Sequence, residues 1–163
     1  MGELFSTIFN GMNLALAGAV IATIMAGIGS AKGVSLCGQA ASGLLSEDPS
    51  KFGKALVLQA LPMTQGIYGL VTALLIFIKL NLFAGGPATP LSPEDGIFYF
   101  VAALPIAVVG LISGILQGKV AASGIVLISK RGDELGHAIT NAALVETFAI
   151  LAVLVSLIAI IFH

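Results

Sequence analysis

Four long stretches almost free of charge constrain the fold of this chain more than any other feature. Three carry no charged side chain and the fourth carries one; they are Leu4–Ala31, Ala55–Ile78, Gly96–Gly118 and Leu135–His163. Each exceeds the roughly 20 residues that a helix needs to cross about 30 Å of hydrocarbon. Only 9% of all residues are charged, against about 25% in soluble domains. The sequence therefore predicts an all-α integral membrane protein with four transmembrane helices.

The basic residues of the polar breaks predict how these helices are oriented. The breaks at 46–54 and 129–137 each contain lysine or arginine, whereas the break at 85–96 contains acidic residues and no basic one. Loops rich in lysine and arginine remain in the cytoplasm. We therefore expect a multi-pass protein of the cell membrane, with loops 46–54 and 129–137 cytoplasmic and both termini outside.

The two halves of the chain resemble each other. The sequence GIGSAK at 27–32 is similar to GILQGK at 114–119, and Gly53 then aligns with Gly136. Because both halves enter the membrane from the same side, this is a parallel repeat. The predicted units are two tandem helical hairpins: residues 1–84, with helices at about 11–44 and 53–82, and residues 85–163, with helices at about 96–128 and 134–162.

Small residues at four-residue spacing line the first helix of each hairpin. The two ridges are Ala19, Thr23, Gly27 and Ala31, and Gly110, Gly114, Gly118 and Ala122. In lipid, such ridges allow helix backbones to approach closely. The pattern is compatible with an inner ring of tightly packed helices and also with the ordinary packing of a bundle.

Glu146 is the only acidic residue within the four stretches. A carboxylate at that depth is costly, so it marks a site that uses it or pairs with it. Gln117 and Glu146 are equally far from the turn that joins their helices, and Thr64 and Gln65 are about as far past the other cytoplasmic turn. We therefore expect all four side chains at one level of the bilayer. The spacing that aligns Gly53 with Gly136 also aligns Met63 with Glu146, so only one hairpin carries a carboxylate.

Carboxylate, amide and hydroxyl oxygens are the ligands that hard cations prefer. This set carries one negative charge, which suits a monovalent cation. Pro62, just before it, also leaves a backbone carbonyl without its usual helical partner. The alternative is a hydrogen-bonded network around a protonated Glu146 that only joins the helices. Tyr68 lies on the same helix face as Thr64 and Gln65, where it either donates to Glu146 or packs as an ordinary aromatic residue.

Four segments resemble the membrane rotor proteolipid of V-type ATPases, the four-helix K or c subunit, and are most similar to its sodium-pumping bacterial forms. They are GIGSAKG at 27–33, LQALPMTQGIYG at 58–69, GILQGKVAA at 114–122 and VET at 145–147. The resemblance covers nearly the whole chain. It implies a ring of identical subunits, with the first and third helices inside and the second and fourth outside.

The resemblance also implies a function and a set of ligands. ATP hydrolysis in a soluble head, joined through a central-stalk subunit, would turn the ring past a membrane stator that supplies an arginine. The chain would have no catalytic activity of its own, and its partners would include the lipid bilayer but no nucleic acid. The implied sodium ligands are Glu146, Gln65, Gln117, Thr64 and the backbone carbonyl of Leu61, with Tyr68 donating to the glutamate. Met63 departs from the small residue expected beside the site.

Three other functions are also compatible with the sequence. The same rotor could carry protons, in which case the two glutamines would not coordinate an ion. A secondary transporter of cationic drugs would also use one intramembrane glutamate, but such pockets favour aromatic faces, and the chain has no tryptophan and only 7% aromatic residues. In a purely structural bundle, Glu146 would be replaceable.

Overall fold

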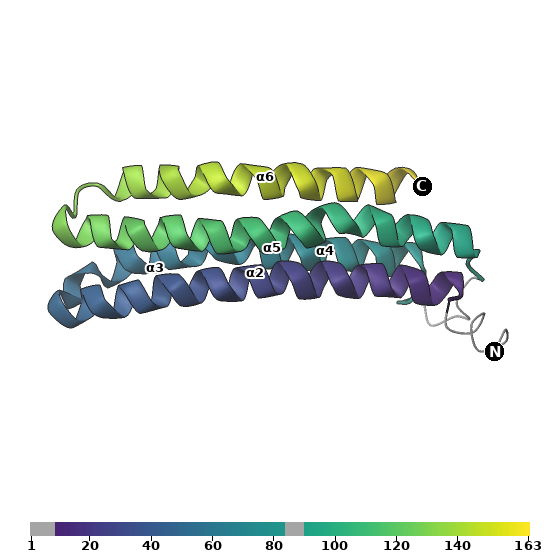
Figure 1. Ribbon diagram of the computed structural model, residues 1–163, viewed down its shortest axis with the longest axis horizontal. Helices are drawn as coiled ribbons and strands as arrows, with labels where there is room; N and C mark the ends of the chain where they lie inside the picture. The colour runs from purple at the N-terminus through teal and green to yellow at the C-terminus, as the bar shows by residue number, and fades with distance from the viewer. Residues whose placement is uncertain (1–8, 84–89) are drawn as a thin grey trace.

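The computed structural model describes residues 9–83 and 90–163 as an elongated antiparallel bundle (Figure 1). α2 (Gly11–Glu47) is followed by η1 (Pro49–Lys51), α3 (Phe52–Ala60), η2 (Leu61–Met63) and α4 (Thr64–Lys79). The second half consists of α5 (Pro93–Lys130) and α6 (Leu135–Phe162). Within residues 9–83 and 90–163, four helical segments are long and apolar enough to cross a membrane: α2, the continuous run from η1 to α4, α5 and α6. The all-α prediction with four such helices is confirmed.

Local capping signals explain where the helices begin and end. Asn10 caps α2 by accepting from the N–H of Asn13 at 2.8 Å, and α2 ends before Pro49, which disfavours a helical residue preceding it. Ser92 caps α5 and Pro93 occupies its first position, where the missing N–H costs nothing. As a result α5 begins at Pro93 and not at the expected position of about 96.

The end of α4 is set by a left-handed residue. Asn81 has a φ of 56°, and the N–H groups of Asn81 and Leu82 donate to the carbonyls of Ile78 and Phe77. This is the bonding pattern of a Schellman motif, and asparagine is among the few residues that adopt the required conformation readily. The helix thus stops a few residues before the expected boundary of about 82. The predicted polar break at 85–96 lies partly outside the described residues, which do not include 84–89.

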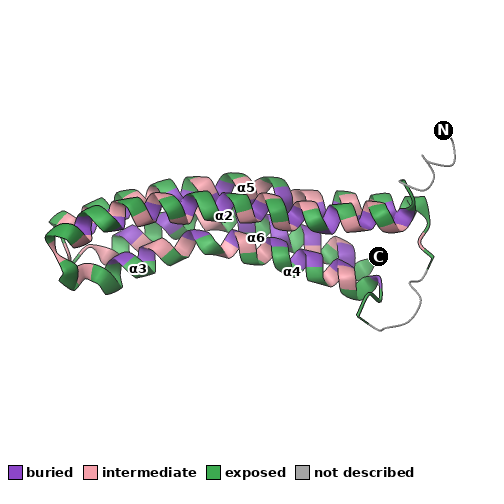
Figure 2. Cartoon of the chain, turned by 90° about the horizontal axis from the view of Figure 1, so that it is seen from below, coloured by how far each residue is buried: buried purple, intermediate pink, exposed green. Residues whose placement is uncertain are grey.

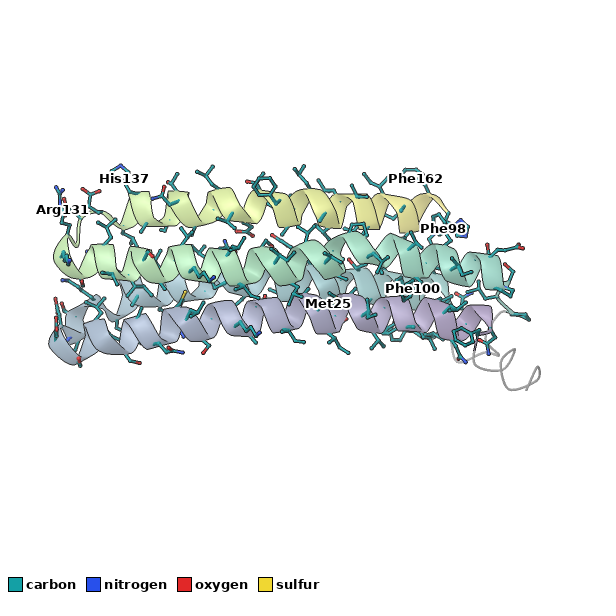
Figure 3. All side chains as sticks on the ribbon, in the orientation of Figure 1. Met25, Phe98, Phe100, Arg131, His137 and Phe162 are labelled. Carbon is teal, nitrogen blue, oxygen red and sulfur yellow. The ribbon has the colours of Figure 1, made fainter. Side chains whose placement is uncertain are left out.

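The loops joining α2 to η1 and α5 to α6 lie at the same end of the bundle, opposite the C-terminus (Figure 1). Lys51 Nζ donates to the carbonyl of Ser129 at 2.9 Å, and Lys54 Nζ donates to that of Gly132 at 2.7 Å. Arg131 and His137 are at this end, whereas Phe98 and Phe162 are at the other (Figure 3). Ser50 donates to Asp48 here and holds the pKa of that carboxyl below its ordinary value. Both basic loops are therefore on one side of any membrane that the bundle crosses.

α2 and α5 are in direct backbone contact through the small-residue ridge of α5, which includes Gly110 and Gly118. On α2 the contact is made by Gly29 and Gly33 and not by the ridge expected from the sequence, because nothing lies within 4 Å of a Cβ atom placed on Gly27, and Ala31 is exposed. A Cβ atom placed on Gly29 would lie 2.6 Å from the carbonyl oxygen of Gly110, and one placed on Gly118 would lie 2.2 Å from Cα of Gly33. The buried residues face the interior of the bundle, and many outward positions are exposed (Figure 2). Those outward positions are largely apolar, for example Leu144 and Phe148 on α6. Such a surface is suited to contact with lipid or with other apolar helices.

Candidate functional site

A series of hydrogen-bonded polar side chains, called the polar chain below, connects α4, α5 and α6. Gln65 Nε2 donates to Gln117 Oε1 at 2.6 Å, and Gln117 Nε2 donates to Glu146 Oε2 at 3.2 Å. Tyr68 donates its hydroxyl to the other carboxylate oxygen of Glu146 at 2.7 Å. Thr64 Oγ1 lies 3.4 Å from Gln65 Oε1 at the far end of the chain. The structure thus brings together all five of the side chains singled out from the sequence.

A break in the second membrane-spanning segment positions Thr64 and Gln65, at one end of the polar chain. Between α3 and α4 the backbone tightens into the 3₁₀ turn η2, which contains Pro62. The hydroxyl of Thr64 donates to the carbonyl of Leu61 at 3.1 Å. A non-standard turn at membrane depth is tolerated where it is enclosed by protein or lines a site. Here it places a carbonyl oxygen next to a threonine hydroxyl, and that threonine directly precedes Gln65.

Burial and charge distinguish the members of the chain. Gln65 and Gln117 are completely buried, whereas Thr64, Tyr68 and Glu146 are partly exposed. Within residues 9–83 and 90–163, no lysine, arginine or histidine forms an ion pair with Glu146. Its hydrogen-bond donors, Tyr68 and Gln117, are both neutral. Burying a glutamine amide without hydrogen bonds would cost a few kcal/mol of folding free energy. The bonds of Gln65 and Gln117 to each other and to Glu146 avoid this cost.

The site offers one carboxylate together with neutral oxygen-bearing groups. The described residues contain no cluster of three or more histidine, cysteine, aspartate or glutamate side chains. One carboxylate is instead linked, through the two glutamine amides, to the hydroxyl of Thr64 and the carbonyl of Leu61. A glutamine amide carries both a donor and an acceptor, so its rotation exchanges nitrogen for oxygen toward a neighbour. The same residues can therefore bond to each other or turn their oxygens toward a cation.

Met63 lies outside the hydrogen-bonded chain. Its side chain is 51% exposed and lines an open groove of about 360 Å³ between α2 and α4, together with Ser30, Gly66 and Leu70. The residue that aligns with Glu146 in the repeat thus faces outward at the bundle surface. Its size does not fill the space between the two glutamines and the carboxylate.

One contact beside the site was not anticipated from the sequence. Ser30 Oγ, on α2, accepts a hydrogen bond from the backbone N–H of Gly66, at the start of α4, at 2.8 Å. The repeat alignment contains a signal that could have drawn attention to it. GIGSAK at 27–32 aligns with GILQGK at 114–119, so Ser30 occupies the position of Gln117 in the first hairpin.

Comparison with known proteins gives the same duplication. The family model that describes the C subunit of ATP synthase matches the chain twice, at residues 17–76 and 100–159. The chain is 49% identical over 146 residues to the V-type sodium ATPase subunit K of Enterococcus hirae, covering 90% of this chain and 89% of that protein. It is 36% identical over 148 residues to the A-type ATP synthase subunit K of Methanocaldococcus jannaschii, covering 91% of this chain and 62% of that protein. The chain therefore belongs to the family of the ATP synthase C subunit, as a four-helix membrane rotor proteolipid in which the family's unit is duplicated.

Proposed function

We propose that this chain is the ion-carrying rotor subunit of a sodium-transporting V-type ATPase. The observation that carries the proposal is the position of Glu146, which is bonded to a buried glutamine that is itself bonded to a second buried glutamine. A proton carrier needs only the carboxylate, whereas a sodium site needs additional neutral oxygens. The similar protein of E. hirae is a subunit of a sodium ATPase, which supports the same choice of ion.

The proposed sodium ligands come from four structural elements. They are the carbonyl of Leu61 in η2, the side chains of Thr64 and Gln65 in α4, Gln117 in α5, and Glu146 in α6. Thr64 Oγ1 is 3.1 Å from the Leu61 oxygen and 3.4 Å from Gln65 Oε1, so these three oxygens already converge. Tyr68 holds one oxygen of Glu146 and leaves the other, now bonded to Gln117, to meet the ion.

Charge neutrality couples ion binding to rotation in this proposal. Glu146 with Na⁺ bound is electrically neutral as a pair and can move through the apolar part of the membrane. The empty carboxylate would cost about 2.5–3.5 kcal/mol or more at that depth. A site must therefore be filled before it leaves the stator. An arginine of the stator subunit would pair with Glu146 there and release the ion.

The proposed assembly is a ring of identical chains turned by a soluble ATPase head through its central stalk. Each chain contributes its two hairpins, residues 1–84 and 85–163. α2 and α5 would form the inner circle, since their backbones are in contact, and the segments containing α4 and α6 would form the outer one. Loops 46–54 and 129–137, which lie at one end of the bundle, would face the cytoplasm, with both termini outside.

Labelling of Glu146 by a hydrophobic carbodiimide tests the choice of ion. This reagent reacts with a protonated carboxyl group in an apolar site. We expect Na⁺ to slow the reaction of the purified chain, because a bound cation keeps Glu146 ionised, and K⁺ at the same ionic strength to have no such effect. The modified residue is identified by mass spectrometry. Labelling that ignores Na⁺ and decreases only as pH rises would instead assign the rotor to protons.

Removing the neutral ligands should weaken sodium binding. Gln117→Ala deletes an oxygen ligand and both of its hydrogen bonds, which corresponds to about 1–3 kcal/mol and an affinity lower by about five- to 150-fold. Thr64→Ala should act in the same direction with a smaller effect, because it removes a single hydroxyl. The measurement is the Na⁺ concentration that halves the rate of labelling. Gln59→Ala is the matched control, since Gln59 lies on α3 beside Gly38 of α2. Affinities that stay at the wild-type value in both variants would remove these residues from the site.

A further inference from the structure

The bond between Ser30 and Gly66 joins two helices at the place where the site's backbone is least regular. Ser30 lies on α2 and is only 7% exposed. Its hydroxyl oxygen accepts from the N–H of Gly66 at 2.8 Å. Ser30 is not among the proposed ligands, and none of the hydrogen bonds in the Gln65–Gln117–Glu146 chain involves it. Any effect of this contact on the site therefore acts through the backbone at Gly66.

The backbone that Ser30 contacts departs from a regular α-helix at Pro62. Here residues 61–63 form a 3₁₀ turn, and the N–H of Thr64 donates to the carbonyl of Leu61, three residues back. Freed backbone groups in membrane helices are satisfied by neighbouring side chains such as serine. Ser30 places such a side chain at the junction between η2 and α4, as an acceptor for the N–H of Gly66.

α2 contacts this junction at two points. A Cβ atom placed on Gly66 would lie 3.2 Å from Ser30 Oγ, so the absence of a side chain at Gly66 permits the approach. One turn further along α2, a Cβ atom placed on Gly33 would lie 2.7 Å from Cβ of Pro62. The segment between Leu61 and Gly66 is thus held against α2 near both of its ends. Three of the five proposed sodium ligands belong to this segment.

We infer that Ser30 is a positioning residue for the sodium site: its hydrogen bond to Gly66 fixes the Leu61 carbonyl and the Thr64 and Gln65 side chains in the geometry that an ion requires. The inference rests on the sodium-binding function proposed above. It also gives the repeat a division of roles. At equivalent positions of the two hairpins, α5 supplies a ligand, Gln117, and α2 supplies the support for the ligands of α4.

The test compares Ser30→Ala with Ser156→Ala in the purified full-length chain, using carbodiimide labelling of Glu146 over a range of Na⁺ concentrations. Ser156 is completely buried and accepts a cross-helix bond from the N–H of Ile106 at 3.4 Å, so its replacement removes the same kind of contact away from the site. We expect Ser30→Ala to raise the Na⁺ concentration for half-protection by about tenfold. Ser156→Ala should leave it unchanged.

A second readout and a second variant separate positioning from general damage. The labelling rate without Na⁺ should be the same in Ser30→Ala and wild type, because Tyr68 and Gln117, and not Ser30, bond to Glu146. Ser30→Cys retains the size of the side chain but offers a much weaker acceptor. It should therefore raise half-protection in the same direction by about threefold, and it decides the question if Ser30→Ala does not fold.

Three outcomes of this experiment would contradict the inference, and they separate the role of Ser30 from the sodium site itself. Wild-type protection by Na⁺ with an unchanged midpoint in the Ser30 variants would overturn the positioning role alone. An equal shift in Ser156→Ala would also overturn it, since the effect would then belong to bundle packing in general. A wild-type chain that Na⁺ does not protect would overturn the sodium site itself, and the role of Ser30 with it.

Discussion

Glu146→Gln should abolish sodium-coupled ATP hydrolysis and sodium transport by the assembled ATPase while the chain still folds. The amide has nearly the same size and can still bond to Tyr68 and Gln117, the two neutral partners of Glu146. It cannot supply the one negative charge of the site. Holding Na⁺ in an apolar interior without that charge costs several kcal/mol, which corresponds to an affinity lower by at least about a hundredfold.

The measurement is Na⁺ uptake into vesicles that contain the complete complex, together with its ATP hydrolysis rate. Glu47→Gln is a suitable control, because Glu47 is an exposed carboxylate at the end of α2 and the change removes the same charge from the chain. Glu146→Asp retains the charge on a shorter side chain and should retain part of the transport. Normal Na⁺ uptake by the Glu146→Gln complex would contradict the proposed mechanism, because it would show that the charge is not needed.

The sequence was sufficient to predict the helices and the depth of the polar side chains. Charge-free stretches of membrane-spanning length leave little choice of fold. Counting residues from each turn placed Gln117 level with Glu146, and the structure brings them within hydrogen-bonding distance. This reasoning succeeds because an α-helix rises by a constant amount per residue, so equal distances from a turn become equal depths.

The details that the sequence did not reveal depend on contacts between elements. Pro62 indicated a break in the helix, but it did not indicate that the break would be a 3₁₀ turn, or that Gly66 just after it would bond to Ser30 on another helix. The helix ends also moved: α5 begins at Pro93 because Ser92 caps it, and α4 ends at Lys79 because Asn81 adopts a left-handed conformation. Capping and cross-helix bonds involve single polar residues, which leave no periodic pattern in the sequence.

The close contact of α2 with α5 connects the packing of the bundle to the site. Gly118, the residue that follows Gln117, meets Gly33, which also packs against Pro62. The carbonyl of Gly118 accepts from the buried thiol of Cys37 at 3.3 Å. Displacing α5 here would move Gln117 away from Gln65, and displacing α2 would move the support of η2. A substitution that disrupts the packing at these glycines is therefore expected to distort the polar chain as well.

Gly118→Ala should consequently destabilise the protein strongly, by about 3 kcal/mol or more. The added methyl group would lie 2.2 Å from Cα of Gly33 and 2.7 Å from its carbonyl oxygen. Because both atoms belong to the backbone of α2, no side chain can turn aside, and the two helices must separate. The measurement is thermal unfolding of the purified chain in detergent, with the Na⁺ midpoint for labelling of Glu146 recorded on the protein that remains folded.

Gly27→Ala is the matched control for this effect. It makes the same chemical change in α2, but nothing lies within 4 Å of the new Cβ atom, and alanine favours a helix over glycine by about 1 kcal/mol. It should leave stability unchanged or raise it, with normal sodium binding. If Gly118→Ala unfolded at the same temperature as Gly27→Ala, the direct backbone contact between α2 and α5 would be wrong. If Gly118→Ala unfolded at a lower temperature than Gly27→Ala but bound Na⁺ normally, the backbone contact would be confirmed. The expected coupling between this contact and the polar chain would then be wrong.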